Sequence, residues 1–116
     1  MPLEEWNCPT NWPYNPWHSL FRRRVPLAAE VEASSTDNRA WVHVTPDADG
    51  MGFTIVYAEI PRHQYEEVLN SWDYDYYWLN VQNCRADNRY ELEGVLAQWI
   101  SDFEVLKPWP LSTSPF

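Results

Sequence analysis

The chain has 116 residues, a formal net charge of −9 and a sequence pI near 4.6. Its length, with 45% hydrophobic and 22% charged residues, predicts one globular domain with its own core. The acidic balance argues against direct binding to nucleic acid or to an anionic membrane, because both require a basic footprint. The sequence shows neither a secretory signal nor a hydrophobic run of spanning length, so we expect a cytoplasmic protein with Cys8 and Cys84 reduced.

The N-terminal 20 residues interleave four prolines with three tryptophans and a tyrosine. Proline at this density disfavours both a helix and a central strand. The rings disfavour disorder, since disordered segments are poor in aromatic residues. We therefore expect residues 1–20 to form an extended arm that packs either on its own domain or on a partner.

Three strands are predicted next. Apolar residues alternate over 25–33, where Pro26 lacks a ladder donor and indicates a late start or an edge position. The β-branched and aromatic segments 41–45 and 53–60 predict a hairpin joined by the loop 47–50.

A helix is predicted after Pro61, which suits a first helical position. Its apolar face is marked at helical spacing by Tyr65, Val68, Leu69 and Trp72. From residue 76 to 83 the pattern becomes strand-like.

The last predicted helix begins at Asn88, which forms a capping box with Glu91. Its buried stripe is predicted to comprise Leu92, Val95, Leu96, Trp99 and Phe103. Gly94 lies inside this helix, where glycine is unfavourable, and we expect it to permit close packing.

Together these elements predict an α+β fold, with a small, mostly antiparallel sheet in the order β-β-β-α-β-α. Two amphipathic helices are expected on one face of the sheet. Residues 21–107 would form the single domain, after the aromatic, Pro-rich arm and before a C-terminal tail at 108–116.

Few patterns indicate catalysis. The sequence contains no His-x₃-His or Cys-x₂-Cys spacing and no glycine-rich phosphate loop, so we expect no metal site, no cofactor and no enzyme. One alternative is a small enzyme that uses Cys84, or a histidine such as His43 or His63 with an aspartate.

The stretch 72–78 contains five aromatic rings and two carboxylates, a composition typical of recognition surfaces. We expect no catalytic residues, and a partner-binding surface made of rings and carboxylates from several elements. Its candidate residues are Asp73, Tyr74, Asp75, Tyr76, Tyr77, Glu66, Glu67, Asp87, Glu91 and Asp102.

Carboxylates spread in this way can imitate the phosphates of a nucleic acid. The sequence therefore predicts a non-enzymatic inhibitor that covers a basic, nucleic-acid-handling site on another protein. Phage anti-defence proteins and immunity proteins share this size and charge, which is an analogy of class and not of motif. An accessory subunit that docks through its aromatic arm is the second hypothesis, and a homodimer is left open.

Overall fold

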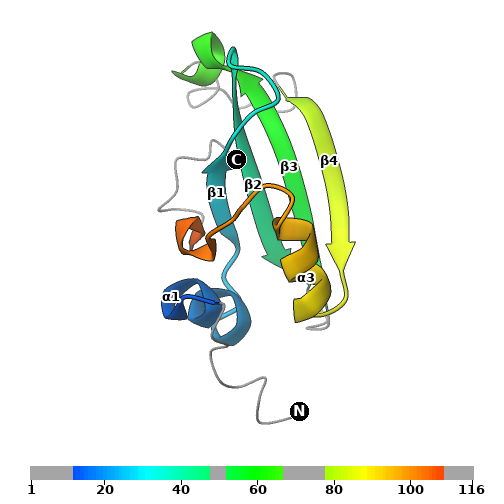
Figure 1. Ribbon diagram of the computed structural model, residues 1–116. Helices are drawn as coiled ribbons and strands as arrows, with labels where there is room; N and C mark the ends of the chain where they lie inside the picture. Colours follow the sequence, from blue (N-terminus) through cyan, green and yellow to red (C-terminus); the bar gives the residue numbers. More distant parts are fainter. Residues whose placement is uncertain (1–11, 48–51, 67–77, 109–116) are drawn as a thin grey trace.

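The computed structural model describes residues 12–47, 52–66 and 78–108, and its framework is an antiparallel sheet (Figure 1). The described residues form five strands in the spatial order β4-β3-β2-β1-β5. With its short helices this is a mixed α+β fold. The strands are β1 (Leu27–Val31), β2 (Asn38–Pro46), β3 (Phe53–Pro61), β4 (Leu79–Ala86) and β5 (Lys107–Pro108).

The central hairpin follows from the alternating sequence. β2 pairs with β3 from Asn38↔Pro61 to Pro46↔Phe53, and β1 pairs with β2 from Leu27↔Val44 to Val31↔Ala40. Because alternate residues of a strand point to opposite faces, each of these strands contributes side chains to both sides of the sheet.

The main core lies on one face of the sheet. Val42 and Val44 of β2 and Ile55 of β3 are buried there against Leu92 and Leu96. These two leucines belong to helix α3 (Arg89–Leu96), which lies in front of β2 and β3 in Figure 1. Leu92 and Leu96 therefore hold this helix on the sheet.

A second, smaller cluster lies on the opposite face. Trp41 alternates with the core residues of β2 and is buried with Ile60, and Tyr65 and Trp78 pack against them. Arg39 lies over the Tyr65 ring at 3.9 Å from its centroid and forms an ion pair with Glu30 at 2.6 Å. Both faces of the sheet are thus partly covered.

The N-terminal segment differs from the extended arm predicted for it. Residues Tyr14–Trp17 form helix α1 and His18–Arg22 continue as the π-helix η2. Pro16 is compatible with this helix because it lies in the first turn, where backbone N–H groups have no helical partner. Trp12 and Trp17 are buried in the main core, and burial of these rings outweighs the poor helix propensity of proline.

The predicted C-terminal helix begins correctly but ends early. Asn88 Oδ1 accepts a hydrogen bond from Glu91 N at 2.9 Å, which is one half of the predicted capping box, whereas Glu91 Oε1 accepts from Asp87 N. The helix stops at Leu96, residues 97–99 form turns, and a 3₁₀ helix, η5 (Phe103–Val105), follows. Extending the stripe to Trp99 and Phe103 on a single helix was wrong, since Trp99 instead stacks on Tyr57 of the sheet.

Gly94 does not serve close packing. A Cβ placed on it would meet nothing within 4 Å, apart from its own helix backbone and chain neighbours. That expectation is also wrong.

After Pro61, the described residues form a short 3₁₀ helix, η3 (Arg62–Gln64), with Tyr65 and Glu66 helical beyond it. Val68, Leu69 and Trp72, the remainder of the predicted apolar face, lie outside the described residues. The following strand spans Leu79–Ala86, whereas residues 76–83 were predicted, and residues 76 and 77 lie outside the described residues. No helix in the described part of the chain has the length and apolar character needed to cross a membrane.

Candidate functional site

Only part of the predicted partner-binding surface can be placed. Glu67 and the acidic, aromatic stretch of Asp73, Tyr74, Asp75, Tyr76 and Tyr77 lie outside the described residues. The other four candidates are Glu66, Asp87, Glu91 and Asp102.

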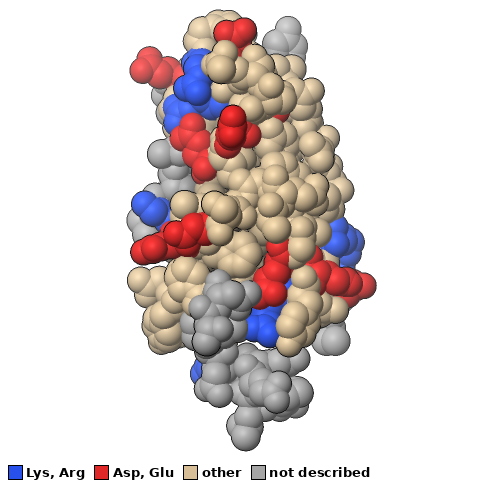
Figure 2. Space-filling model, viewed as in Figure 1, with Lys and Arg blue, Asp and Glu red and all other residues tan. Residues whose placement is uncertain are grey.

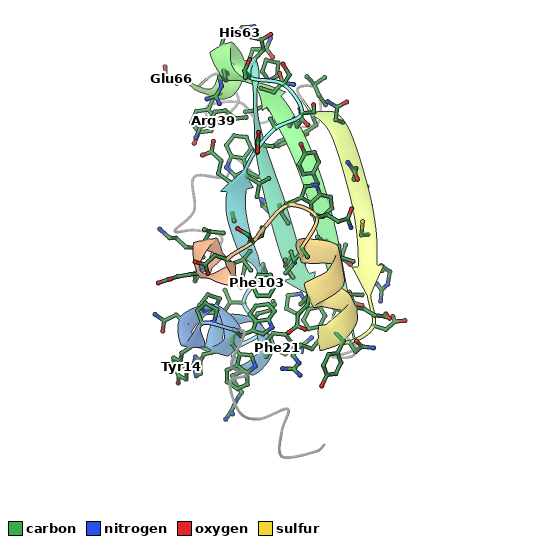
Figure 3. All side chains as sticks on the ribbon, in the orientation of Figure 1. Tyr14, Phe21, Arg39, His63, Glu66 and Phe103 are labelled. Carbon is green, nitrogen blue, oxygen red and sulfur yellow. The ribbon has the colours of Figure 1, made fainter. Side chains whose placement is uncertain are left out.

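These four carboxylates are distributed over several elements. Glu66 follows η3 at one end of the molecule (Figure 3), whereas Asp87 and Glu91 lie at the start of α3. Glu91 Oε1 accepts a hydrogen bond from Asp87 N at 3.0 Å, and Asp102 caps η5 by accepting from Glu104 N at 3.0 Å. Figure 2 shows the acids on this side of the molecule in separate groups, interspersed with Lys and Arg. The described candidates therefore do not form one contiguous acidic patch.

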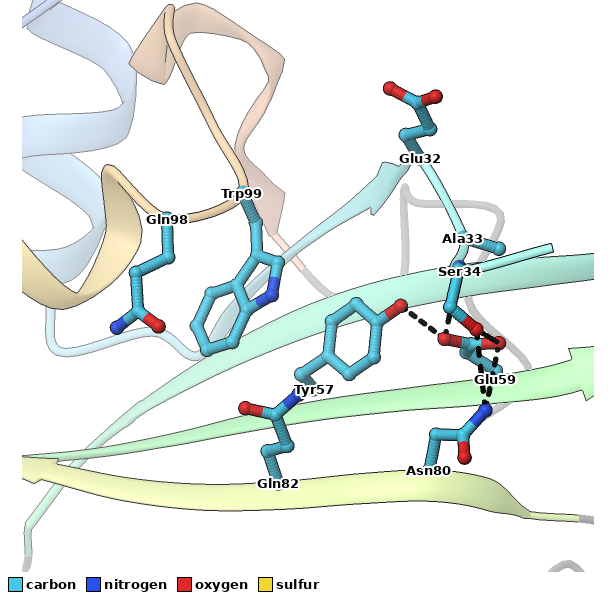
Figure 4. A pocket seen from close by; sticks show the side chains of 9 residues that line it. All are labelled: Glu32, Ala33, Ser34, Tyr57, Glu59, Asn80, Gln82, Gln98 and Trp99. Carbon is cyan, nitrogen blue, oxygen red and sulfur yellow. Dashed lines mark hydrogen bonds between the residues drawn. The ribbon is translucent and has the colours of Figure 1, made fainter.

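A different carboxylate, that of Glu59, occupies the most distinctive polar site. It borders a cavity of about 540 Å³ on the core side of the sheet (Figure 4). The described residues that line this cavity are Glu32, Ala33, Ser34, Tyr57, Glu59, Asn80, Gln82, Gln98 and Trp99.

The Glu59 side chain is fully buried and is surrounded by hydrogen-bond donors. Its Oε1 accepts from Ser34 Oγ at 3.0 Å, from Asn38 Nδ2 at 2.9 Å and from Asn80 Nδ2 at 3.3 Å. Its Oε2 accepts from Ser34 N at 3.1 Å and from the Tyr57 hydroxyl. One carboxylate thus joins β3 to β4, to the start of β2 and to the segment between β1 and β2.

Local backbone geometry brings these donors together. The β3–β4 register shifts between Tyr57 and Glu59, an irregularity of the β-bulge type. On β4 the irregularity coincides with Asn80, whose φ of 51° lies in the left-handed region that asparagine tolerates better than most residues. Asn80 is thereby directed at Glu59 from the edge strand (Figure 4).

The aromatic wall of the cavity comes from two distant segments. Trp99 stacks on Tyr57 with a centroid separation of 5.3 Å and an interplanar angle of 14°. Tyr57 lies on β3, while Trp99 follows the end of α3, so the stack fixes the chain after the helix onto the sheet. Figure 4 shows the Trp99 indole above Tyr57, with Gln82 and Gln98 nearby.

The environment of Glu59 keeps it ionised. Burial by itself raises the pKa of this carboxyl, but hydrogen bonds from Tyr57, Asn38 and Ser34 outweigh it and lower the pKa to about 2. Burial is also the largest cause that raises the pKa of Tyr57, followed by its hydrogen bond to Glu59. At neutral pH the pair is therefore a neutral phenol that donates to a carboxylate.

The negative charge of Glu59 is solvated by dipoles. Within the described residues its hydrogen-bond donors are two hydroxyls, two side-chain amides and one backbone N–H, all of them neutral. Buried charges in proteins are usually paired with an opposite charge. The cavity therefore adjoins a permanent negative charge, and Glu32 adds a second carboxylate at its lining.

This arrangement is poorly suited to acid–base chemistry at neutral pH. A carboxyl with a pKa of about 2 carries no proton to donate and is a weak base. Cys84, His43 and His63 are not among the described residues that line the cavity. Burial lowers the pKa of His43 to about 4. In the described part of the chain, no three His, Cys, Asp or Glu side chains are grouped as metal ligands would be.

Sequence reasoning missed Glu59, although the pattern contains a signal for it. Phe53, Ile55, Tyr57 and Glu59 share one face of β3 by their period of two, so the apolar series ends on a carboxylate. A charged residue on the core face of a strand requires several donors, and such a residue is a candidate for a structured polar site.

Comparison of the chain with protein-family models, with curated proteins and with solved structures finds no match. The residues of the chain itself are therefore the basis for a functional proposal.

Proposed function

We propose that this protein is a non-enzymatic binding protein that covers a basic surface on a partner protein. In the more specific form of the proposal it is an inhibitor, and the basic surface is a nucleic-acid-handling site. The net charge of −9 supports steering toward such a partner, because opposite charges accelerate the association of proteins.

The observation that carries the proposal is the ionised Glu59 carboxylate beside an open cavity. Its donors in the described residues are neutral, so its negative charge is available to attract a cation. Glu59 itself has no exposed surface, so a cation would interact with it through the electrostatic field and not by direct contact.

The lining of the cavity suits an arginine or lysine side chain of the partner. Glu32 is exposed and offers a carboxylate for a direct ion pair, while Gln82 and Gln98 offer amide oxygens. The Tyr57–Trp99 ring pair supplies an aromatic wall against which a guanidinium group can pack. We therefore propose this cavity as one anchoring point for the partner.

The alternative of an accessory subunit that docks through its aromatic arm is less well supported. Trp12 and Trp17 are buried in the domain's own core, and Trp12 Nε1 donates to Glu93 Oε1 at 2.7 Å. These two rings could reach a partner only by leaving that core, at the cost of their buried apolar area.

The proposal is tested by capturing partners from a lysate of the native host on the immobilised full-length chain, with washes at low and then at high salt. We expect a basic protein that the high-salt wash releases, since salt screens exposed charges over about 8 Å at physiological ionic strength. A partner that resists the high-salt wash would favour the accessory-subunit alternative instead.

Variants then separate the cavity from the overall charge. With the captured partner, Glu32→Gln and Trp99→Leu should each weaken binding about three- to tenfold. Glu104→Gln is the matched control, because it removes an exposed carboxylate that does not line this cavity. Equal losses for Glu32→Gln and Glu104→Gln would reject the cavity as the anchoring point.

The predicted acidic, aromatic stretch is tested in the same assay. If it contributes to the surface, charge reversal of Asp73 together with Asp75 should slow association with the partner. Unchanged binding would remove that stretch from the proposed surface.

A further inference from the structure

The outer edge of β4 is the longest open strand edge in the described sheet. β4 is the terminal strand and pairs with β3 on one side. At the opposite end of the sheet, β1 is followed by β5, a strand of two residues that includes Pro108. A terminal strand presents backbone N–H and C=O groups that can pair with another strand.

β4 lacks most of the features that protect natural edge strands. β4 contains no proline, and its one charged side chain, Arg85, is paired with Asp47. All side chains from Leu79 to Asn83 are exposed, with Leu79 at 41% and Val81 at 47% of their full exposure. The irregularity at Asn80 disturbs the start of the strand, but regular pairing with β3 continues from Gln82 to Ala86.

We propose that β4 pairs with β4 of a second copy of this chain, antiparallel about a two-fold axis near Gln82. The two sheets would join into one continuous sheet across the dimer. An antiparallel strand pair satisfies two-fold symmetry, because the same edge then serves as both halves of the interface.

The chemistry of the strand selects a second copy over the basic partner proposed above. Gln82 and Asn83 carry amides that both donate and accept hydrogen bonds, so they are complementary to themselves. The segment 79–84 offers no carboxylate to a basic surface. Each copy carries nine net negative charges. Because the segment 79–84 has no charged side chain, two copies can approach along it without a direct contact between like charges.

The first test is sedimentation of the purified full-length chain over a range of concentrations and salt. We expect a monomer–dimer equilibrium in which salt strengthens the dimer, because it screens repulsion between two acidic chains. A monomer at millimolar concentration in both low and high salt would overturn the proposal.

Charge variants on the edge provide the specific test. Val81→Lys and Val81→Glu each place like charges near the axis and should weaken the dimer about tenfold. An equimolar mixture of the two variants should recover association, since opposite charges then lie diagonally across the axis. Val105→Glu is the matched control, as Val105 is similarly exposed but lies on η5. An undiminished dimer in both Val81 variants would rule out the β4 interface.

Cross-linking identifies the interface directly. In a chain with both native cysteines replaced by serine, Val81→Cys or Asn83→Cys should cross-link between copies with a short bis-maleimide, since diagonal neighbours across the axis lie about 7–8 Å apart. Tyr90→Cys, which is more exposed and lies on α3, should not. Cross-linking of Tyr90→Cys alone would place the interface elsewhere.

The proposed dimer and the proposed function can be rejected independently of each other. Salt should strengthen the dimer and weaken binding of a basic partner, and the Val81 and Glu32 variants should each affect only one of the two. Loss of partner binding in the Val81 variants would show that β4 belongs to the partner site.

Discussion

Tyr57 donates its phenolic hydrogen to the carboxylate of Glu59, two residues further along the same strand. Both side chains point to the core face of β3, and the register shift between them allows Asn80 of β4 to reach the same carboxylate. The pair thus connects a backbone irregularity to a buried charge. It also adjoins the Tyr57–Trp99 stack, so the polar network and the aromatic wall share a residue.

Replacement of Tyr57 by Phe should destabilise the protein by about 1–3 kcal/mol, because a buried carboxylate loses one of its donors. The ring and its stack on Trp99 are retained in this variant. Urea unfolding followed by tryptophan fluorescence measures the change. Tyr90→Phe is the control, since Tyr90 is 69% exposed and should tolerate the loss of its hydroxyl. Equal stability of Tyr57→Phe and the wild type would mean that water replaces the phenol without cost.

The free energy of unfolding should fall in acid as Glu59 becomes protonated. The pKa of Glu59 is lowered from 4.5 to about 2. Its contribution to the free energy of unfolding is therefore fully present above pH 4.5 and is lost as the pH falls toward 2. The expected loss is about 3 kcal/mol. It is measured by urea unfolding at a series of pH values. In Tyr57→Phe the loss should be smaller and should be complete at a higher pH, because removal of a donor raises the pKa of Glu59 in the folded state toward its ordinary value. A wild-type profile that is flat between pH 4.5 and 2 would contradict this assignment.

His43 should produce a separate loss of stability at higher pH. Burial lowers the pKa of His43 from 6.5 to about 4. The contribution of the neutral side chain to the free energy of unfolding is therefore fully present above pH 6.5 and is lost as the pH falls toward 4. The side chain is partly exposed, and we expect about 1–2 kcal/mol after allowance for solvent. His43→Gln should remove the change between pH 6.5 and 4.5 and leave the Glu59 step. An identical profile in His43→Gln would assign the upper step to another group.

Trp12→Ala should destabilise the domain by about 3–5 kcal/mol, as large aromatic truncations in cores do. Trp12 is buried, lies 4.4 Å from Phe103 and 5.3 Å from Phe21 between ring centroids, and donates to Glu93. Thermal unfolding provides the measurement. Tyr14→Ala is the control, because Tyr14 is well exposed on α1. A small effect of Trp12→Ala would mean that the N-terminal segment packs without contributing to stability.

Gly94→Ala should stabilise the protein by about 0.5–1 kcal/mol. Gly94 lies inside α3, and an added Cβ would have open space around it. Alanine restricts the unfolded chain more than glycine does and fits helical backbone without strain. Chemical denaturation compares the two proteins, and a destabilised Gly94→Ala would reveal an unfavourable contact at this position.

The sequence by itself determined the elements whose signals are local. Alternating β-branched residues specified the β2–β3 pair, and the Asn88–Glu91 capping box specified the start of α3. Composition specified the net negative charge of the chain. These features depend on backbone propensity and on neighbouring residues, so they can be predicted from a single sequence.

Only the tertiary structure decided the features that depend on distant partners. A proline-rich segment is helical because Trp12 and Trp17 are buried in the core. Helix α3 ends earlier than predicted, and Trp99 beyond its end stacks on Tyr57. The five donors around Glu59 come from residues 34, 38, 57 and 80, which no local pattern groups together. A buried carboxylate is stable only where long-range packing supplies its donors, and for that reason the site emerged from the fold and not from the sequence.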